Sequence, residues 1–534
     1  MRQKYDEEVQ RVLQDRGPLL GSELQATLVE GMGVTGNNAK QIIRRLRTSG
    51  SLYSTEPIRF DHGQYLYYLP HQSLSTKLRS LMIRGPRARI FAAMVELGGF
   101  LVWDEFVKIC GGVTDYSYAD GHHPAAEEIY QEMRDLGLVI SVEFNGDRII
   151  KARTDWTHIS EPTPTQMFQR LHDLEIGRTL LQDLMKWLER MNVAGWETSQ
   201  LNDPLNPLDF NRYRWDAMAY SYIWGLASRV EGDVKKKGSI ILVEAVLTRK
   251  VQQFDIEGFA ARVGVQYGRL RRTTSFRILP ICFVSSIDPP VLKLARQHGI
   301  IIISLGEAFG TVIAGLIEKL RRLKVDVQIE VLQEILTAMQ PTGQMDKLNN
   351  VRGYLFNVLV ALIFTDNGDH PRISRTYTGR EGACECDIVV RPEEDFMIVC
   401  ETKGWHSKAV VPLGANKDER HSLKRFFERT VKIVEEVKAV PVLPIFVTSG
   451  QFSPEGLDYL KDWSNRKQTK RLLKRRRGKV PTQIYYDRQA LKDFLGDEPE
   501  YTVHRKILKE FFLIGRYRPT SARYAFSATI SRTS

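Results

Sequence analysis

The chain has 534 residues, 43% of them hydrophobic and 26% charged, which excludes a disordered or collagen-like protein. The apolar stretch Tyr354–Phe364 is too short for a membrane helix, which needs about 20 residues. No apolar segment at the start resembles a signal peptide, and five cysteines are too few for a disulfide scaffold. We therefore expect a cytoplasmic protein of three or four domains with no membrane partner.

The positive charge is concentrated at the C-terminal end of the chain. The net charge is +12, and Lys461–Ser534 alone contains 19 basic and 7 acidic residues, so the rest is neutral overall. The density peaks in Arg466–Lys479, where nine of fourteen residues are basic. Such density favours binding to phosphate polymers, and a solvated loop is the alternative. The candidate nucleic-acid contacts here are Lys470, Arg471, Lys474, Arg475, Arg476 and Arg477.

Residues 1–72 follow the order of a winged helix. The predicted elements are helices Lys4–Asp15, Glu23–Val29 (capped by Ser22) and Asn37–Thr48, then strands Ser51–Ser54 and Gln64–Leu69. The third helix places apolar side chains on one face and a basic set largely on others. That basic set is Lys40, Arg44, Arg45 and Arg47. Such a helix enters the DNA major groove in helix-turn-helix proteins, although a winged helix that contacts only protein is equally open.

Residues 73–158 repeat this plan more loosely. We expect helices Arg87–Leu97, Trp103–Cys110 and Pro124–Leu136, followed by a hairpin, Val139–Ala152, that turns at Asn145-Gly146. The third helix is acidic, which argues against phosphate contact. This module is therefore predicted to be structural or to bind a partner protein.

From Thr163 onward, helices alternate with β-rich segments, which indicates α/β domains. Two similar segments, Leu279–Ser286 and Leu443–Gly450, each follow a polar helix and an apolar strand that contains a glutamate, Glu244 or Glu401. The simplest explanation is one α/β domain present twice, at 159–325 and 326–500, with a basic tail at 501–534. Coincidence between unrelated α/β domains is the alternative.

The second copy contains the residues that suggest catalysis. Strands Glu385–Arg391 and Phe396–Lys403 form a hairpin centred on residue 394, in which Asp387 lies opposite Glu401, Val389 opposite Val399 and Arg391 opposite Met397. Opposed carboxylates are destabilising unless a divalent cation lies between them. Lys403 shares a face with Glu401, and the Thr402 carbonyl can add a metal ligand. A one-residue slip would separate the acids, and a surface ion pair on an edge strand is the other alternative.

These residue types suit phosphodiester hydrolysis. Carboxylate oxygens hold Mg²⁺ or Mn²⁺, which lowers the pKa of a bound water and offsets charge on the phosphate. Lys403 is expected to orient the water and stabilise the transition state. A Glu-x-Lys triplet alone is weak evidence, because a second triplet, Glu436–Lys438, falls inside a predicted helix without a partnering acid.

Asp346–Leu495, with its acid, turn, Glu-x-Lys strand, helix and further strand, resembles the PD-(D/E)xK, or restriction-endonuclease-like, nuclease superfamily. The resemblance implies an αβββαβ core, Mg²⁺ dependence and Asp387, Glu401 and Lys403 as the catalytic set. Many members carry a glutamate on the first helix, where this chain has Asn357. The possible substitutes are Asp366 and Asp369. His406 is a candidate for assisting the leaving group or an ordinary surface histidine.

The first copy is predicted to be degenerate. Asp216 and Glu244 match the two acids, but Val246 stands at the lysine position, so water activation should fail unless Arg249 or Lys250 reaches the site. We expect a scaffold or DNA-clamping domain, with a Rossmann-like ligand sensor as the alternative. The cysteines beside the second site, at positions 384, 386 and 400, are expected to be small buried hydrophobic residues rather than metal ligands.

The sequence therefore predicts a mixed α/β multidomain protein with two winged helices and two restriction-endonuclease-like domains, the first degenerate. The expected function is a Mg²⁺-dependent endonuclease acting on double-stranded DNA, as a homodimer or with a helicase or effector partner. The superfamily analogy suggests prokaryotic restriction, anti-phage defence or DNA repair. The alternatives are a catalytically inactive DNA-binding regulator or assembly factor, and an enzyme that cleaves RNA.

Overall fold

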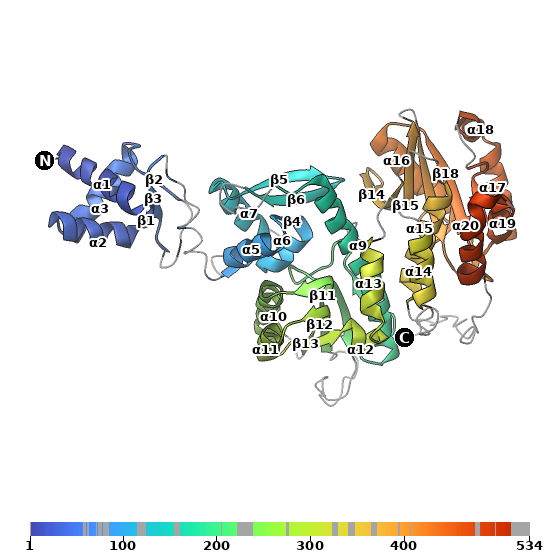
Figure 1. Cartoon of the computed structure of the whole chain (residues 1–534), viewed down its shortest axis with the longest axis horizontal. Helices are drawn as coiled ribbons and strands as arrows, with labels where there is room; N and C mark the ends of the chain where they lie inside the picture. The colour runs from blue at the N-terminus through green and yellow to red at the C-terminus, as the bar shows by residue number, and fades with distance from the viewer. Residues whose placement is uncertain are drawn as a thin grey trace, which may run out of the picture. The chain divides into compact units, whose positions relative to one another are not determined.

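The structure, a computed structural model, is mixed α/β (Figure 1) and divides into two compact units. The N-terminal unit comprises Met1–Gly177 with Met185–Ala308, and the C-terminal unit comprises Arg178–Leu184 with Phe309–Ser534. The residues described are 2–56, 60, 63–70, 72, 77, 85–114, 124–153, 161–203, 206–221, 239–273, 277–322, 329–339, 348–364, 371–393, 396–405, 407–475, 481–496 and 498–513. Among the helices of these ranges, none is both long and apolar enough to cross a membrane.

The first module is a small helical domain with a three-stranded antiparallel sheet of order β1-β3-β2. Its elements are α1 (Arg2–Arg16), β1 (Leu19–Leu20), α2 (Gly21–Met32), α3 (Gly36–Thr48), β2 (Tyr53–Ser54) and β3 (Leu66–Tyr68). Helix α3 buries Ile42, Ile43 and Leu46, as its apolar periodicity predicts. The expected cap at Ser22 is wrong. Helix α2 begins at Gly21, and the Glu23 carboxylate instead accepts the Leu20 N–H at 2.7 Å.

The second module has its own three-stranded antiparallel sheet, of order β4-β6-β5. Its elements are α5 (Gly85–Glu96), β4 (Phe100–Val102), α6 (Trp103–Cys110), α7 (Ala126–Asp135), β5 (Val139–Phe144) and β6 (Asp147–Ala152). The predicted hairpin turn is confirmed, with Asn145 and Gly146 at φ values of 58° and 87°. On the acidic helix α7, Glu127 bonds Arg148 of β6 at 2.6 Å, so this acid stabilises its own module.

The remaining elements that lie wholly or mainly in the N-terminal unit include a five-stranded sheet and its helices. They are α9 (Pro164–Arg190), β7 (Gln200–Leu201), β8 (Asp209–Phe210), β9 (Tyr213–Arg214), β10 (Ala217–Ser221), β11 (Ser239–Val251), α10 (Gln253–Thr273), β12 (Ile278–Ile287), α11 (Pro289–Gln297), β13 (Ile301–Ser304) and α12 (Leu305–Phe309). The sheet order is β13-β12-β11-β10-β7, with β10 antiparallel to both of its neighbours. The Rossmann-like alternative predicts a mostly parallel sheet, and this mixed sheet does not have that pattern.

The C-terminal unit contains a second five-stranded sheet, of order β14-β15-β16-β18-β20. Its elements up to the last strand are α13 (Ile313–Arg322), α14 (Ile329–Met339), α15 (Asn349–Phe364), β14 (Arg372–Gly379), β15 (Gly382–Glu393), β16 (Phe396–Lys403), β17 (Val410–Val411), the π-helix η4 (Arg425–Thr430), α16 (Val431–Lys438), β18 (Val442–Thr448), β19 (Gln451–Phe452), α17 (Pro454–Asn465), α18 (Lys467–Arg475) and β20 (Tyr485–Tyr486). After it come α19 (Arg488–Leu495), η5 (Pro499–Tyr501), α20 (Thr502–Ile507) and η6 (Leu508–Phe512). Of the expected tail, residues 501–513 form helices with buried apolar side chains.

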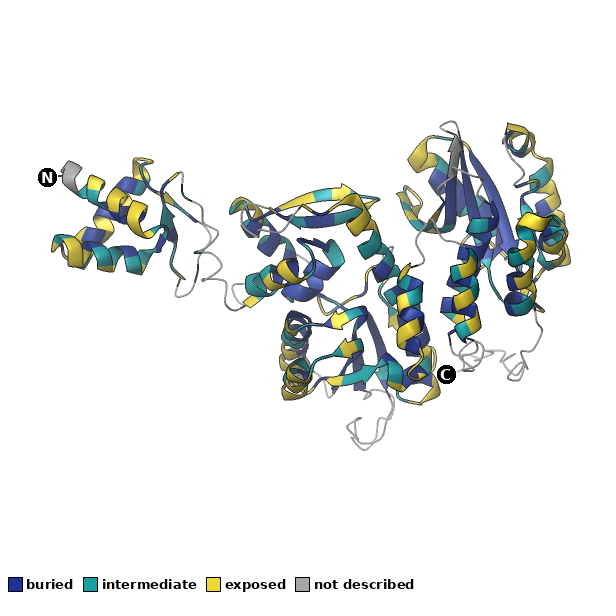
Figure 2. Cartoon of the chain, in the orientation of Figure 1, coloured by how far each residue is buried: buried dark blue, intermediate teal, exposed yellow. Residues whose placement is uncertain are grey.

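The two large sheets have the same strand order and the same pairing directions. In each, the glutamate-bearing strand, β11 or β16, is antiparallel to the strand before it and parallel to the strand after it. The register matches as well, since Pro280 lies opposite Leu242 and Pro444 opposite Val399, in both cases two residues before the glutamate. The two shared segments therefore include equivalent strands, β12 and β18, of two sheets with the same topology. Figure 2 shows the central strands of the C-terminal sheet as buried, in keeping with their apolar sequences.

Candidate active site

The hairpin of β15 and β16 has the predicted register over its central pairs. These pairs are Ile388↔Cys400, Val389↔Val399 and Val390↔Ile398. The expected pair of Arg391 with Met397 is lost, because the register shifts between Val390 and Glu393 before the turn. The shift lies at the turn end of the hairpin, so it leaves Asp387 beside the end of β16 that carries Glu401 and Lys403.

Lys403 brings the two carboxylates together. Its Nζ lies 2.5 Å from Oε1 of Glu401 and 3.8 Å from Oδ2 of Asp387, so both carboxylates lie beside one ammonium group. The side chains of Asp387 and Glu401 are 22% and 19% exposed. The three predicted catalytic residues therefore form one cluster that solvent can reach.

Thr402 and Asn357 fix the position of Asp387. The Thr402 N–H donates to Oδ2 of Asp387 at 2.7 Å, and the Thr402 hydroxyl lies 3.3 Å from the same oxygen and contacts Oδ1 of Asn357. Asn357 comes from α15, which approaches β16 closely at Gly404. A Cβ on Gly404 would lie 2.6 Å from Cβ of Phe356, so only glycine allows this approach. Asn357 thus holds Thr402, at the place where the resemblance leads one to expect a glutamate.

Each carboxylate of this cluster keeps one oxygen available. Within the described parts of the chain, Oδ1 of Asp387 and Oε2 of Glu401 accept no hydrogen bond. Carboxylate oxygens of this kind fit a hard divalent cation, and the remaining ligands would be waters, substrate oxygens and the Thr402 carbonyl. The same ranges contain no group of three or more His, Cys, Asp or Glu side chains arranged for a metal ion. A cation here would therefore be held by few protein ligands.

The electrostatics of the cluster depend on burial. Burial raises the pKa of Glu401 to about 7, with Lys403 opposing the rise and Asp387 adding to it. Burial on its own would lower the pKa of Lys403, but the charges of Glu401 and Asp387 raise it above its ordinary value. At neutral pH the ammonium is therefore kept, while Glu401 is close to half protonated until another cation replaces its proton.

Two further residues near this cluster were missed by the sequence analysis. His421 lies on an ordered loop, its ring 6.2 Å from that of Trp405, and burial together with the charges of Lys403 and Arg425 lowers its pKa. Arg425 begins the π-helix η4, and its charge also acts on Glu401. Both follow the motif by some twenty residues, and no local pattern marks them. The earlier candidates His406, Asp366 and Asp369 lie outside the described residues.

The three cysteines near this cluster form no disulfide among the described residues and are buried, as predicted for small hydrophobic residues. They are Cys384, Cys386 and Cys400.

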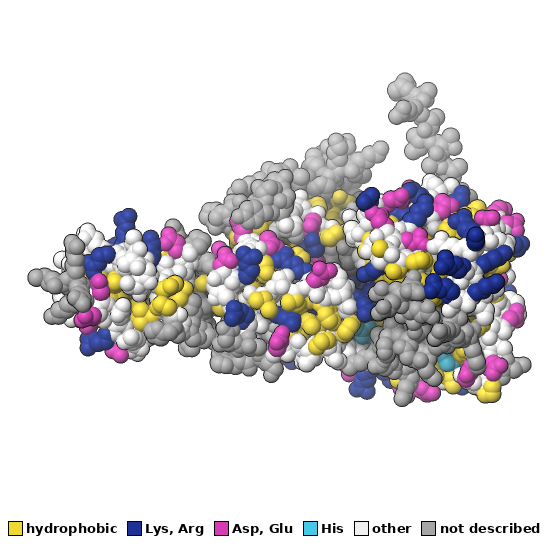
Figure 3. Space-filling model, turned by 90° about the horizontal axis from the view of Figure 1, so that it is seen from above, with side chains coloured by type: hydrophobic (Ala, Val, Ile, Leu, Met, Phe, Trp, Pro, Cys, Tyr) yellow, Lys and Arg dark blue, Asp and Glu magenta, His cyan; other side chains and the backbone are white. Residues whose placement is uncertain are grey.

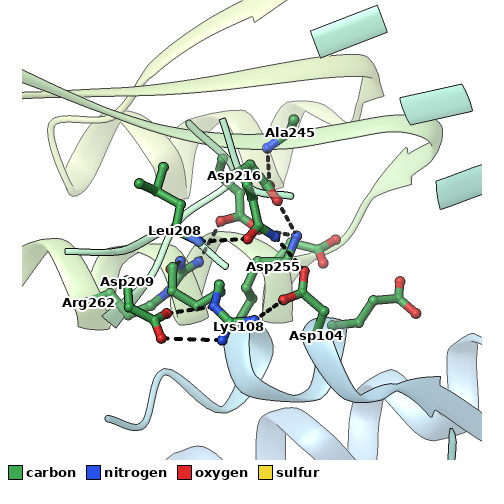
Figure 4. Close-up of polar contacts among 12 residues, drawn as sticks. Asp104, Lys108, Leu208, Asp209, Asp216, Ala245, Asp255 and Arg262 are labelled. Atoms are coloured by element: carbon green, nitrogen blue, oxygen red, sulfur yellow. Dashed lines mark hydrogen bonds and ion pairs between the residues drawn. The ribbon is translucent and has the colours of Figure 1, made fainter. Parts of the chain in front are cut away.

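The first acid pair has the same backbone arrangement as the second. Oδ2 of Asp216 accepts the N–H of Ala245 at 2.8 Å, which is the contact that Asp387 makes with Thr402 (Figure 4). The two residues suggested as replacements for a lysine at position 246 form other ion pairs. Arg249 pairs with Asp255 at 2.6 Å, and Lys250 pairs with Asp288 at 2.6 Å.

An ammonium group does lie beside this pair, that of Lys108 on α6 of the second module. Its Nζ is 2.7 Å from Oδ1 of Asp216 (Figure 4) and 3.8 Å from Oε1 of Glu244, so it bridges the two acids as Lys403 does. Arg262 of α10 binds Oε2 of Glu244 at 2.6 Å. All four carboxylate oxygens of this pair thus contact a group of the protein, and each of the four residues is at most 9% exposed.

A glycine allows Lys108 to reach this position. A Cβ on Gly258 of α10 would lie 2.7 Å from the Ile109 carbonyl oxygen and 2.9 Å from that of Lys108. Helix α6 therefore packs directly on the backbone of α10. Burial raises the pKa of Glu244, and the pKa of Lys108 is raised by the two acids against the opposing effect of burial.

The predicted nucleic-acid residues fall into paired and unpaired groups. On α3, Arg45 contacts Asp6 and Arg47 contacts Glu56, whereas Lys40 and Arg44 are exposed without an ion pair among the described residues.

Helix α18 carries the C-terminal basic run. It buries Thr469 and Leu472 and exposes Lys470, Arg471 and Lys474, so this part of the run is an ordered helix rather than a loop. Figure 3 shows Lys and Arg side chains gathered on the C-terminal unit. Arg475 ends the helix, and Arg476 and Arg477 lie outside the described residues.

Comparison with protein-family models gave no match, and comparison with curated protein sequences gave no significant match. The contacts described above are therefore the basis for assigning a function.

We expect Lys108→Met to destabilise the N-terminal unit by about 3–5 kcal/mol, because it leaves two buried carboxylates without their shared cation. Urea unfolding of the full chain measures this change. The matched control is Lys250→Met, which removes a lysine whose ion pair is about half exposed and should cost no more than about 1 kcal/mol. Equal effects of the two substitutions would contradict the role of Lys108.

The raised pKa of Glu401 predicts a pH dependence of stability without metal. Below pH 4.5 the carboxyl is protonated in both states, and between about 4.5 and 7 the unfolded chain loses this proton first. The free energy of unfolding should therefore fall as the pH rises through this window. In calorimetry with EDTA at pH 5 and pH 8, Glu401→Gln should lose less stability than the wild type. Glu455→Gln, at an exposed position, should follow the wild type, and an unchanged dependence in Glu401→Gln would refute the assignment.

Proposed function

We propose that the chain is a metal-dependent nuclease that hydrolyses phosphodiester bonds in double-stranded DNA, with its active site at Asp387, Glu401 and Lys403. The observation that carries this proposal is the difference between the two acid pairs. The first pair is sealed by two protein cations, whereas the second keeps one free oxygen on each carboxylate and is partly exposed. The second pair therefore keeps carboxylate oxygens that a cation from solution could bind.

The residues of the second pair have separate tasks in this proposal. Asp387 and Glu401, with the Thr402 carbonyl, would hold Mg²⁺ or Mn²⁺, which supplies positive charge for the phosphate and lowers the pKa of a coordinated water. Lys403 lies beside both acids, and its raised pKa keeps the ammonium protonated at neutral pH. It would orient the attacking water and stabilise charge in the transition state. Asn357 would keep Asp387 in place through Thr402.

The topology of the chain supports this assignment by analogy. The order α15, β14, β15, β16, α16, β18 is the αβββαβ order of the PD-(D/E)xK superfamily, and the first module has the helix and strand order of a winged helix. DNA is the substrate we propose, on the basis of the exposed cations of α3 and α18. A role in prokaryotic restriction, anti-phage defence or DNA repair follows only from the superfamily analogy.

A second candidate is a catalytically inactive DNA-binding regulator in which both acid pairs are relics. The observation that favours it is the small number of metal-ligating side chains within the described residues, together with Asn357 in place of an acid. This candidate predicts DNA binding without metal binding, so metal affinity separates it from the nuclease. Cleavage of RNA would use the same site as cleavage of DNA.

We expect the wild type to nick or linearise supercoiled plasmid with Mg²⁺ or Mn²⁺, and Asp387→Asn and Lys403→Met each to lower the rate by about 10²-fold or more. Agarose gels measure the conversion. The matched control is Lys438→Met, in the other Glu-x-Lys triplet, which lies exposed on α16 and should cleave as the wild type does.

Full activity in Lys403→Met would contradict the role given to Lys403. If the plasmid stays intact in all variants, calorimetric titration with Mn²⁺ decides between the two candidates. Binding by the wild type that Asp387→Asn abolishes would support a nuclease that needs RNA, modified DNA or a partner. No binding by either would support the relic.

Neutralising the exposed cations of α18 should weaken DNA binding and its salt dependence. Each phosphate contact contributes about 0.9 to the slope of log affinity against log salt, so the triple variant Lys470→Ala, Arg471→Ala, Lys474→Ala should lose up to about 2.7 units of slope. Fluorescence anisotropy at several salt concentrations with EDTA measures the slope. The triple variant Lys461→Ala, Lys432→Ala, Lys438→Ala changes exposed lysines of α17 and α16 and serves as the control. An unchanged slope in the α18 variant would mean that these cations form a solvated surface and do not contact DNA.

A further inference from the structure

The first module contains a hollow of about 420 Å³ between α2, α3 and the strand β3. Its volume lies in the range of sites for small organic ligands, about 300–1,000 Å³. The hollow is lined by Gly21, Ser22, Gln25, Lys40, Ile43, Arg44, Arg47, Gly63, Gln64, Tyr65 and Tyr67. These residues include a cationic set on α3 and a set of aromatic and amide side chains on α2, on β3 and just before β3.

The cationic set is available to an anionic ligand. Lys40 and Arg44 are exposed, and the side chain of neither forms a hydrogen bond or ion pair with any residue that the structure describes. Arg47 also lines the hollow, although it forms an ion pair with Glu56. Free cations on one helix suit the phosphate groups of a nucleic-acid strand.

The second set of lining residues offers aromatic rings and two polar groups. Tyr65 and Tyr67 are half-buried, and the ring of Tyr67 lies where a Cβ on Gly21 would approach it to 3.3 Å. Gln25 donates its amide to the Gly36 carbonyl, and Gln64 accepts the Ser22 N–H. This leaves the carbonyl oxygen of Gln25 as an acceptor and the amide of Gln64 as a donor, with no partners among the described residues.

A cationic set, tyrosine rings and an adjacent acceptor and donor together match the chemistry of one nucleotide. Aromatic side chains stack on unpaired bases, and amides bind the base edges that a duplex keeps paired. We propose that this hollow binds one unpaired nucleotide of a nucleic-acid strand, with Lys40 and Arg44 on its phosphate and Tyr65 on its base. The inference rests on the proposed nucleic-acid binding of the chain and is independent of cleavage.

The same geometry gives the module a substrate preference that the active site does not supply. A nucleotide in the hollow has left the base stack, so the module favours DNA that is single-stranded, bulged or frayed over a fully paired duplex. Unstacking costs least where a base is already unpaired. The first module would therefore direct the chain to irregular DNA.

The experiment compares three fluorescent probes in EDTA on the full-length Asp387→Asn chain, which keeps them from being cut. The probes are a single strand, a paired duplex, and that duplex with one added unpaired nucleotide. We expect the bulged duplex to bind about tenfold more tightly than the paired one, and Tyr65→Ala to remove this preference. Lys40→Ala with Arg44→Ala should weaken all three. The matched control is Tyr53→Ala, which removes an exposed tyrosine of the same module that does not line the hollow.

Each other outcome overturns a defined part of the proposal. Equal affinity for the bulged and paired duplexes, or a preference that survives Tyr65→Ala, removes the nucleotide site and leaves the nuclease proposal standing. Competition by a free mononucleotide as strong as that by the single strand makes the ligand a free nucleotide instead of a strand. Failure of every probe to bind overturns the proposed DNA binding as a whole, whereas cleavage is tested separately on plasmid.

Discussion

Two carboxylates held on neighbouring strands inside a sheet need positive charge beside them, and this chain meets that need in two ways. In both five-stranded sheets the backbone places an aspartate beside the strand that carries a glutamate, and the aspartate accepts the N–H of the residue after the glutamate. In the first sheet, Lys108 of α6 and Arg262 of α10 form ion pairs with the two acids. Among the described residues, the second pair forms ion pairs with Lys403 alone, so two acids face one paired protein cation where the first pair has two.

The sealed pair also joins two modules. Lys108 belongs to the second module, yet its ammonium lies in the core of the first large sheet, 108 residues away along the chain from Asp216. A buried ammonium destabilises a fold unless it is paired, and buried carboxylates do so without a cation. Separating the two modules would therefore expose these charges to solvent or leave them buried without a partner. The buried pair thereby connects the second module to the first large sheet, and the glycine at position 258 is the steric condition for this contact.

The sequence was sufficient for the parts that depend on local patterns. Strand β16 has the predicted bounds, and the central register of its hairpin follows from alternation and turn position. It was insufficient where a contact joins distant segments. Nothing in the residues around Lys108 distinguishes it from a surface lysine on an amphipathic helix, and only the close approach at Gly258 takes it into the core. At the start of α2, the side chains of Ser22 and Glu23 are both able to cap the helix. The backbone geometry there favours Glu23, which the sequence alone does not show.

The contrast between the pairs also explains why a lysine that follows the glutamate by two residues matters. Side chains two apart on a strand share a face, so Lys403 reaches the acids without help from another element. Its position depends on β16 alone, and the rest of the site can stay open to solvent. Val246 at the matching position makes the first pair depend on a helix from another module, and that helix covers the acids as it neutralises them. Charge compensation from within the strand is therefore what allows a site to remain accessible, and compensation from outside is what closes it.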